Sequence, residues 1–332
     1  MKEITTVCIV GPGRMGTGIA TALLSAGLGV RVFLLDIKKR PFGSERQALE
    51  RARNDIERNL LLLRDLGEFK GEIETCLAQL ILTREEGEEL KQCAVVFETL
   101  PERTDLKQTF LRDKERCFHP RAVIASATSS IDLRTFYEAA QHEERIVITH
   151  WLNPAFLIPL VEVATTEKTA GWAAESILGF LGELRKVPVQ LQNSPGFIIP
   201  RIQVAAMNEA IRIIEEGVAG AEEVDTAVKA GFGFRLAVLG LIEFIDLGGV
   251  DILYYAGRYL HQELGHEHYR PLESVSAKME RNEVGPRSGK GFYDYNNVDT
   301  DALFRKRYRA FVELLNLIRT SNSRNFQGGI KD

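Results

Sequence analysis

The chain lacks the features that mark a membrane protein or a protein that binds nucleic acid. No uninterrupted apolar stretch approaches the roughly 20 residues that a membrane-spanning helix requires. The formal net charge of -4 provides no broad basic surface for nucleic acid. The start, Met1-Lys2-Glu3-Ile4, leads directly into a strand-like run and has neither the apolar core nor the cleavage site of a secretory signal. We therefore expect a cytoplasmic globular protein whose partner is neither nucleic acid nor membrane.

Cysteine is also scarce. Cys8, Cys76, Cys93 and Cys117 are scattered along the chain without the short spacings of metal-binding or redox motifs. In a chain with no export signal, an even number of cysteines is weak evidence for disulfides. We therefore expect four reduced structural thiols and no metal site.

The chain does have the length and apolar content for about two domains, with 332 residues of which 45% are hydrophobic. From Ile4 to about residue 190, short apolar runs alternate with longer amphipathic stretches. The runs cover residues 7–10, 30–35, 95–97, 123–125 and 146–148. Such runs, separated by helical lengths, predict a mainly parallel sheet with helices on both faces, a doubly wound α/β domain of the Rossmann type.

After Asn193-Ser194-Pro195-Gly196 the pattern becomes helical. One helix is expected over Arg201–Glu216 with Gly217 as its C-terminal cap, and an amphipathic segment follows Tyr295 between residues 303 and 318. We expect that segment to pack on its own domain. The predicted division is a cofactor-binding domain over residues 1–192 and an all-α domain over residues 193–332, whose apolar content leaves room for a homodimer interface.

A glycine-rich turn follows the first expected strand. It reads Gly11-Pro12-Gly13-Arg14-Met15-Gly16 and opens into a helix-compatible stretch. Gly11 permits a tight turn, Gly13 lets the backbone approach a pyrophosphate, and Gly16 allows close helix packing. The helix N-terminus stabilises the anion. We expect the whole turn, including Pro12, Arg14 and Met15, to bind a dinucleotide.

The second expected strand ends at Asp36, about twenty residues beyond the last glycine of the turn. A carboxylate there can accept hydrogen bonds from the adenosine ribose, which favours NAD over a cofactor with a 2′-phosphate. Lys38, Lys39 and Arg40 lie close enough to weaken that preference. A plain strand–turn–helix with an N-cap aspartate is the alternative for the whole constellation.

Polar residues follow two later strands. Ser126-Ala127-Thr128-Ser129-Ser130 comes after one apolar run, and His150 ends the run at 146–148. Residues at the carboxyl ends of parallel strands face the ligand site of a doubly wound sheet, so His150 is a candidate acid/base group. Together with an amide at Asn153 and a carboxylate at Glu162, it supplies the parts of a hydride-transfer site.

Further motifs continue this pattern in order along the chain. They are Pro101-Glu102 with Lys107, Ser129-Ser130, His150-Trp151-Leu152-Asn153-Pro154, Leu160-Val161-Glu162, Ser194-Pro195-Gly196-Phe197 and Gly289-Lys290-Gly291-Phe292-Tyr293-Asp294-Tyr295. With the glycine turn, they resemble the L-3-hydroxyacyl-CoA dehydrogenase family, including its 3-hydroxybutyryl-CoA dehydrogenase and lambda-crystallin-like members. The resemblance covers nearly the whole chain.

The resemblance implies a role for each matching residue. His150 would be the catalytic base, Glu162 its orienting carboxylate and Ser129 a contact to the reacting oxygen. Glu102, Lys107 and Asn153 would contact NAD. Simpler explanations exist for each residue taken alone: a surface charge for Glu162, a helix N-cap for Ser129, a turn residue for Asn153 and a solvated face for Lys107.

Two positions depart from the family pattern. Many members carry an asparagine before the arginine that follows Pro-Gly-Phe, and this chain has Pro200, a residue suited to the first turn of a helix. Asn208 cannot replace that amide, because eight helical residues add roughly 12 Å of rise. Asn59 and Leu66 stand where relatives hold the coenzyme A nucleotide with a serine and a lysine. Arginines and a lysine nearby, at positions 53, 58, 64 and 70, could contact the 3′-phosphate or form a solvated face.

Three functions therefore compete. The resemblance implies an NAD-dependent oxidoreductase acting on a short-chain L-3-hydroxyacyl-CoA such as 3-hydroxybutyryl-CoA. The departures leave open the same chemistry on a free 3-hydroxy acid or related alcohol. A crystallin-like resemblance also allows a catalytically silent NAD-binding protein, which the presence of Ser129, His150 and Glu162 argues against.

Overall fold

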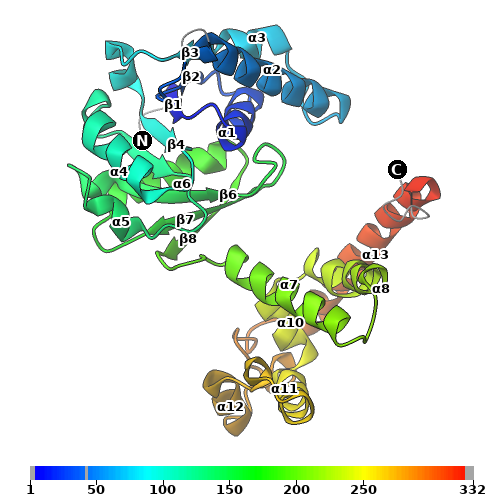
Figure 1. Ribbon diagram of the computed structural model, residues 1–332. Helices are drawn as coiled ribbons and strands as arrows, with labels where there is room; N and C mark the ends of the chain where they lie inside the picture. Colours follow the sequence, from blue (N-terminus) through cyan, green and yellow to red (C-terminus); the bar gives the residue numbers. More distant parts are fainter. Residues whose placement is uncertain (1–3, 42–43, 326–332) are drawn as a thin grey trace. The chain divides into compact units, whose positions relative to one another are not determined.

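The computed structural model describes residues 4–41 and 44–325, with side chains described as far as residue 320, and it separates into two compact units (Figure 1). The first unit ends at Ala205 and the second begins at Ala206. Met1–Glu3, which open the chain, and the last residues of the expected second domain, 326–332, lie outside the described residues. The expected boundary at residue 192 stays a prediction.

The first unit is built on one sheet of eight strands in the order β3-β2-β1-β4-β5-β6-β7-β8. The strands are β1 (Thr6–Val10), β2 (Arg31–Leu35), β3 (Leu80–Thr83), β4 (Val95–Glu98), β5 (Val123–Ser126), β6 (Ile146–Trp151), β7 (Leu160–Thr165) and β8 (Val187–Gln192). From β3 to β6 all pairings are parallel, whereas β7 runs antiparallel to β6 and β8 runs parallel to β7. The expected mainly parallel, doubly wound sheet is confirmed.

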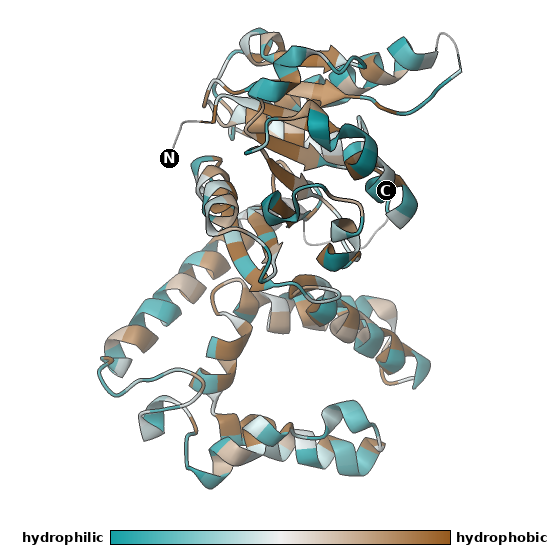
Figure 2. Cartoon of the chain, turned by 90° about the vertical axis from the view of Figure 1, so that its left-hand side faces the viewer, coloured by the Kyte–Doolittle hydropathy of each residue, from teal (hydrophilic) through white to brown (hydrophobic). Residues whose placement is uncertain are grey.

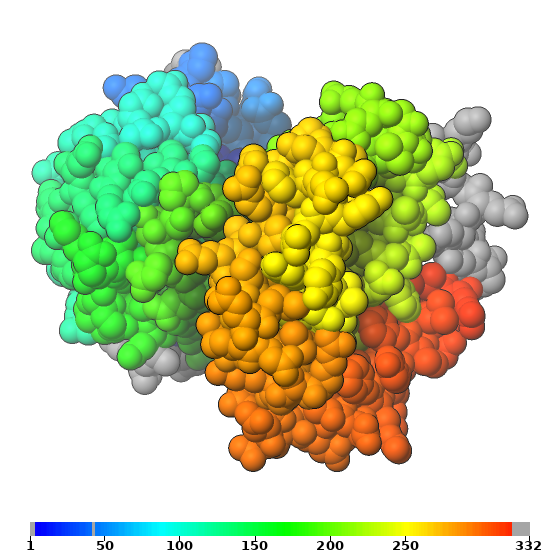
Figure 3. All heavy atoms as spheres, turned by 90° about the horizontal axis from the view of Figure 1, so that it is seen from below, coloured from blue at the N-terminus to red at the C-terminus, as the bar shows by residue number. Residues whose placement is uncertain are grey.

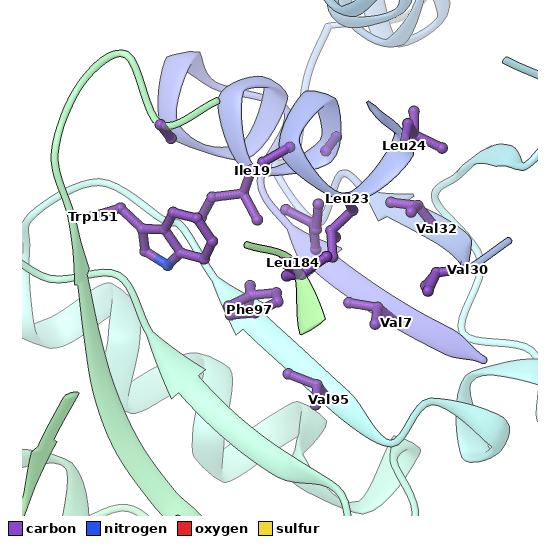
Figure 4. Packing of buried hydrophobic residues seen from close by; sticks show 14 of the residues in the cluster. Val7, Ile19, Leu23, Leu24, Val30, Val32, Val95, Phe97, Trp151 and Leu184 are labelled. Carbon is purple, nitrogen blue, oxygen red and sulfur yellow. The ribbon is translucent and has the colours of Figure 1, made fainter. Parts of the chain in front are cut away.

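Helices cover both faces of this sheet, because the strand side chains alternate between two hydrophobic clusters. Val7 and Ile9 of β1 point to one face, where α1 (Arg14–Ser25), α2 (Ser44–Asp65) and α6 (Gly171–Glu183) pack. Cys8 and Val10 point to the other face, where α4 (Thr104–Lys114) and α5 (Leu133–Tyr137) pack. Figure 4 shows the first cluster, and in Figure 2 the strands are mostly hydrophobic whereas the helices carry more polar residues.

Three strands went unrecognised in the sequence pattern: β3, β7 and β8. The strands β3 and β8 lie at the two edges of the sheet, and neither has a fully buried residue. β8 has no continuous apolar run and tolerates Pro188, as an edge strand can. β3 has the short apolar run Leu80-Ile81-Leu82, but only Gln79 separates it from the helix Ile73–Ala78. All four cysteines are free, as expected.

The second unit is helical. The short helix α3 (Ile73–Ala78) belongs to the first unit, and α7 (Ile199–Glu215) joins the two. Beyond it come α8 (Ala221–Ala227), a π-helical turn (Val228–Gly233), α9 (Phe234–Leu236), α10 (Leu241–Gly248), α11 (Val250–Leu264), α12 (Glu273–Glu280) and α13 (Thr300–Asn325). In Figure 3, α11 and α12 lie side by side in yellow and orange.

The last segment packs on the second unit, as expected. Phe311 of α13 stacks on Phe234 with 5.5 Å between ring centroids, and Arg307 pairs with Glu243 of α10 at 2.7 Å. The helix expected over Arg201–Glu216 begins two residues earlier, at Ile199, and Gly217 ends it with a left-handed φ of 70°. Within the described residues, no helix has both the length and the hydrophobicity of a membrane span.

A buried carboxylate ties the motif Gly289–Tyr295 to α10. Asp246 is 1% exposed, and its two oxygens accept hydrogen bonds from the main-chain N–H groups of Phe292 (2.9 Å) and Tyr293 (2.8 Å). A side chain at Gly291 would place its Cβ 2.4 Å from that carboxylate. The motif is therefore explained by packing within the second unit.

We expect Asp246→Ala to lower the free energy of unfolding by about 3 kcal/mol, because it leaves two part-buried N–H donors and the buried hydroxyl of Tyr295 without an acceptor. Chemical denaturation of the full chain measures the change. Asp294→Ala, which removes an exposed carboxylate from the same motif, is the control. Equal effects of the two substitutions would contradict this account.

Candidate active site

The glycine turn between β1 and α1 is shaped by close backbone approaches. Gly11 has φ of 111°, and a Cβ on it would lie 3.0 Å from the carbonyl oxygen of Thr99. A Cβ on Gly16 would lie 2.0 Å from the carbonyl oxygen of Gly11. The first and last glycines are therefore required by the fold of the turn itself.

Gly13 differs, because a Cβ there would meet nothing within 4 Å. Gly13 is the N-cap of α1, and no side chain accepts a hydrogen bond from the first turn of that helix. A helix N-terminus with open space in front and free N–H groups fits a pyrophosphate, since both the donors and the helix dipole favour an anion. The turn therefore has the shape that a dinucleotide requires.

Asp36 follows β2 and is almost fully buried. Its carboxylate already has two partners: Arg40 Nε donates to Oδ2 at 2.6 Å, and the N–H of Lys38 donates to Oδ1 at 3.2 Å. Arg40 thus lies directly beside the carboxylate, as its place in the sequence suggested. Asp36 retains acceptor capacity for a ribose hydroxyl, because a carboxylate can accept about four hydrogen bonds.

The strand order brings the other candidate residues to the same edge of the sheet. The carboxyl ends of β1, β4, β5 and β6 lie next to one another, so the glycine turn, Glu98, Ser126 and His150 occur in that order along the edge. Neighbouring strands are about 4.8 Å apart, which places His150 roughly 14 Å from the glycine turn across the sheet. This separation distributes the candidate residues along an extended ligand rather than around one point.

His150 and Glu162 form a buried pair. The antiparallel register of β6 and β7 sets these two residues directly opposite each other, so their side chains share a face. His150 Nδ1 lies 2.7 Å from Glu162 Oε2, and the side chains are 7% and 1% exposed. The sequence had suggested His150 from its place at a strand end, and the sheet register supplies its partner.

Glu162 also holds the start of α7. Its Oε1 accepts hydrogen bonds from the main-chain N–H groups of Ile198 (2.8 Å) and Ile199 (2.9 Å). Burial opposes ionisation of Glu162, but the hydrogen bonds from His150, Ile199 and Ile198 outweigh it and lower the pKa of the carboxyl below its ordinary value. A charged Glu162 is therefore favoured beside His150.

The turn before α7 places the ring of Phe197 next to that of His150. Gly196 and Phe197 both have left-handed backbones, with φ of 73° and 46°. The ring centroid of Phe197 lies 5.3 Å from that of His150. Left-handed φ is unusual for phenylalanine, so the surrounding structure must hold it. This gives Ser194-Pro195-Gly196-Phe197 a physical role in shaping the histidine environment.

The pair fixes how His150 can exchange a proton. A carboxylate at Nδ1 favours the tautomer that carries its proton there, since that N–H can donate to Glu162. The Nε2 atom then presents a lone pair, and no residue in the described ranges hydrogen-bonds to it. This geometry would let Nε2 accept a proton while Nδ1 stays hydrogen-bonded to the carboxylate.

Glu102 gathers the polar residues that follow β5. Its Oε1 accepts hydrogen bonds from Thr128 Oγ1 (2.6 Å), from the N–H of Ser129 (3.0 Å) and from the N–H of Ser130 (2.9 Å). Burial opposes its ionisation, but the hydrogen bonds from Thr128 and Ser130 and the charge of Lys107 lower the pKa of Glu102. The hydroxyl of Ser129 lies 3.3 Å from the same oxygen and is exposed.

Lys107 belongs to a buried ion pair that the sequence analysis missed. Its Nζ lies 2.9 Å from both oxygens of Glu98, and both side chains are nearly inaccessible. Glu102 Oε2 is farther away, at 3.8 Å. Glu98 also accepts a hydrogen bond from Ser126 Oγ. The place of Glu98 at the end of an apolar strand could have revealed it by the argument applied to His150.

The two departures from the family pattern acquire physical explanations. Pro200 is the second residue of α7, where its missing N–H costs nothing.

The second departure lies on α2. Asn59 donates to Thr21 Oγ1 of α1 at 3.3 Å and so connects the two helices. Arg58 pairs with Asp55 at 2.5 Å and Arg53 with Glu57 at 3.8 Å. Arg64 and Lys70 are exposed, and Leu66 lies just beyond α2. This surface resembles a solvated helix face.

Comparison with known proteins supports the same interpretation over both parts of the chain. The family model for the 3-hydroxyacyl-CoA dehydrogenase NAD-binding domain matches residues 6–194, and the model for the C-terminal domain of that family matches residues 196–295. The chain belongs to the 3-hydroxyacyl-CoA dehydrogenase family. It is therefore an NAD-dependent oxidoreductase, and NAD is its cofactor.

Several members of the family are similar to this chain over nearly their full length. A probable 3-hydroxybutyryl-CoA dehydrogenase of Deinococcus radiodurans is 30% identical, with 86% of this chain and 99% of the relative aligned. A 5-formyl-3-hydroxy-2-methylpyridine 4-carboxylate 5-dehydrogenase of Mesorhizobium japonicum is 28% identical over 95% of this chain and 98% of the relative. The solved 3-hydroxyacyl-CoA dehydrogenase of Archaeoglobus fulgidus superposes with a TM-score of 0.74 at 30% identity, covering 94% of this chain and 99% of that chain.

The structure brings the predicted site residues to one edge of the sheet in three groups. The glycine turn stands with Asp36 nearby, Glu102 binds the segment with Ser129, and His150 binds Glu162. Asn153 is exposed, just beyond His150, and its side chain has no hydrogen bond to another described residue. Within residues 4–41 and 44–325, no group of three or more potential ligands could hold a metal ion.

Two alanine substitutions in the glycine turn are expected to separate cofactor binding from folding. Gly13→Ala should leave the thermal midpoint unchanged and weaken NADH binding about tenfold or more, since its methyl group enters only the space that a pyrophosphate needs. Gly16→Ala should lower the thermal midpoint as well, because its methyl group meets the backbone of Gly11. Fluorescence titration with NADH and thermal denaturation measure both effects. Wild-type affinity in Gly13→Ala would refute the assignment.

Proposed function

We propose that this protein interconverts an L-3-hydroxyacyl-CoA and the corresponding 3-oxoacyl-CoA, with a short acyl chain such as that of 3-hydroxybutyryl-CoA. The observation that carries the proposal is the buried His150–Glu162 pair at the carboxyl edge of a sheet with a dinucleotide turn. Family membership and several relatives named 3-hydroxybutyryl-CoA dehydrogenase support the substrate class.

In this mechanism His150 is the proton carrier. Hydride acceptance from C3 is the chemistry that bound NAD supplies. In the oxidising direction His150 Nε2 accepts the proton of the 3-hydroxyl group, while Glu162 stabilises the imidazolium through Nδ1. The hydroxyl of Ser129, which lies 3.3 Å from Glu102 Oε1, would turn to donate its hydrogen bond to the reacting oxygen. In reduction the imidazolium returns the proton.

The remaining candidate residues would hold the cofactor. The turn from Gly11 to Gly16 would bind the pyrophosphate, and Asp36 the adenosine ribose. Asn153 would contact the cofactor directly, which its exposed amide, not hydrogen-bonded to any described residue, supports. Glu102 would contact the cofactor through Oε2, which lies 3.8 Å from Lys107 Nζ. Burial of Lys107 against Glu98 favours support over direct contact for that lysine.

A second candidate keeps this chemistry on an acid or alcohol that is not a coenzyme A ester. Two observations favour it. The arginines of α2 are partly occupied by carboxylates of their own helix, which weakens the case for a 3′-phosphate site. The similar protein from Mesorhizobium japonicum is named for a pyridine carboxylate substrate and aligns with 95% of this chain.

Substrate comparison distinguishes these candidates. NADH consumption is measured with acetoacetyl-CoA, with acetoacetate and other free 3-oxo acids, and with 5-formyl-3-hydroxy-2-methylpyridine 4-carboxylate. We expect kcat/KM for the thioester to exceed that for acetoacetate by about 100-fold or more, because binding energy from the carrier contributes to the transition state. Preference for a free acid or the pyridine would favour the second candidate. Binding of NADH with no turnover of any compound would support a catalytically silent protein.

Substitution of the pair tests the mechanism. We expect His150→Gln to lower kcat by about 10²- to 10⁴-fold, the usual contribution of a general base. Glu162→Gln should cause a comparable loss, because an amide can donate to Nδ1 and so favour the tautomer with a blocked Nε2. Glu167→Gln alters an exposed carboxyl just beyond the same strand and is the matched control. Full activity of both pair variants would exclude this mechanism.

We also propose that the protein is a homodimer. No residue of α7 is buried. Its apolar residues Val204, Met207 and Ile211 are each more than half exposed. On α11, Tyr255 and Tyr259 are similarly exposed. Contiguous apolar helix faces of this kind are typical of subunit interfaces.

Light scattering during size-exclusion chromatography should give twice the chain mass of 37.2 kDa for the wild type. Met207→Asp with Ile211→Asp should shift the protein toward the monomer, because a dimer would bury both charges without partners. Gln203→Asp is a polar control on the same helix. A monomeric wild type at micromolar concentration would disprove the proposal.

A further inference from the structure

Lys186 is a buried lysine whose ammonium group contacts only main-chain carbonyl groups and an indole ring. It is 9% exposed, and Nζ donates to the carbonyl oxygens of Ala155 at 2.7 Å and Ile158 at 2.9 Å. No carboxylate in the described part of the chain forms an ion pair with it. Burial lowers the pKa of Lys186 to about 8. A buried charge without a counter-charge is costly, so its retention calls for an explanation.

The backbone at the end of α6 directs the Lys186 side chain into the interior. Arg185 has a left-handed φ of 57°. The N–H of Arg185 donates to the carbonyl oxygen of Gly182 at 2.9 Å, and the N–H of Lys186 donates to the carbonyl oxygen of Leu181 at 3.0 Å. These two hydrogen bonds form a Schellman ending, which turns the chain sharply after a helix. The next residue begins β8, and its N–H donates to the carbonyl of Pro159 at 2.8 Å. Lys186 is therefore held on both sides along the chain.

The segment that Lys186 holds comes directly after β6 and its catalytic histidine. It runs from Asn153 to Pro159, and within it the N–H groups of Leu157 and Ile158 both donate to the carbonyl of Pro154 at 2.9 Å. Two carbonyls of the segment point at the ammonium of Lys186. Without that donor, two largely buried carbonyl groups would lose their hydrogen bonds.

The other side of the segment rests on the helix of the dinucleotide turn. A Cβ at Gly18 of α1 would lie 3.2 Å from Cβ of Ala155. Trp151, at the end of β6, is buried in the same region, and Figure 4 places its ring beside Ile19 of α1. Lys186 Nζ lies 5.7 Å from the centroid of that ring. The segment is thus enclosed between the lysine and α1.

We infer that Lys186 is a positioning residue for cofactor binding: it holds the segment from Asn153 to Pro159 against α1 and so keeps the Asn153 amide where it can contact NAD. Lys186 itself contacts neither cofactor nor substrate. The inference rests on the proposed role of Asn153 in the function described above. It predicts a selective effect on cofactor affinity, whereas a lysine that only supports the core would affect folding alone.

The first test compares wild type with Lys186→Met, which keeps the unbranched apolar stem of the side chain and removes the ammonium donors. NADH affinity is measured by fluorescence titration below the thermal midpoint of each protein. We expect the Kd for NADH and the KM for NAD to rise about tenfold or more, as loss of buried hydrogen bonds predicts. At saturating NAD, kcat should stay within about threefold of wild type, since His150 and Glu162 are untouched.

Hydrogen exchange provides a local measurement of the same effect. The amides of Leu157 and Ile158 should exchange faster in Lys186→Met, and those of α4, on the other face of the sheet, should not change. Lys186→Gln is the second variant, because it retains a polar end but is too short to bridge both carbonyls. If Lys186→Met does not fold, Lys186→Gln should still show a raised Kd for NADH.

Arg185→Gly is the matched control. It relieves the left-handed backbone at the neighbouring residue and preserves the lysine, so NADH affinity should equal that of wild type. A folded Lys186→Met or Lys186→Gln variant with wild-type affinity would overturn the inference, whatever its thermal midpoint. A Kd raised equally in Arg185→Gly would overturn it too.

Failure of the proposed function gives a different pattern. A wild-type protein that binds NADH but turns over neither thioester nor free acid would disprove the proposed function. The binding and exchange comparison would still decide the role of Lys186. A wild-type protein that does not bind NADH would refute both.

Discussion

The site depends on one carboxylate that has two kinds of partner. One oxygen of Glu162 is hydrogen-bonded to Nδ1 of His150, and the other accepts hydrogen bonds from the main-chain N–H groups of Ile198 and Ile199 at the start of α7. The same charge therefore orients the histidine and anchors the segment that leads toward the second unit. Because helix N-termini favour negative charge, α7 also keeps Glu162 ionised. A change in the position of the first residues of α7 would therefore shift Glu162 and, through it, His150.

Much of the fold can be predicted from the sequence, because the central strands are buried on both faces and so form continuous apolar runs. The runs at 7–10, 95–97 and 146–148 all correspond to strands near the middle of the sheet. The edge strand β8 mixes polar and apolar residues, and the short apolar run of β3 follows α3 so closely that it resembles a helix end. The reversed direction of β7 follows from pairing between strands, which hydrophobic periodicity does not report.

The site is less predictable than the fold, since a buried charge has no distinct signature in sequence. Lys107 and Lys186 look like ordinary surface residues until their partners are known. His150 could be found because it ends an apolar strand, and Glu162 came from family resemblance. The register of β6 and β7 then provides an independent physical reason to connect them. Lys186, which immediately precedes the edge strand β8, had no comparable signal.

The reversal at β7 also changes where functional side chains can arise. In the parallel part of the sheet, the ligand edge is reached as each strand ends. The last two strands run the other way, so they reach that edge as they begin. Glu162 is the third residue of β7, and Lys186 immediately precedes β8. A search for functional residues at strand endings alone would miss both. In folds with such a reversal, the first residues of the outer strands are candidates as well.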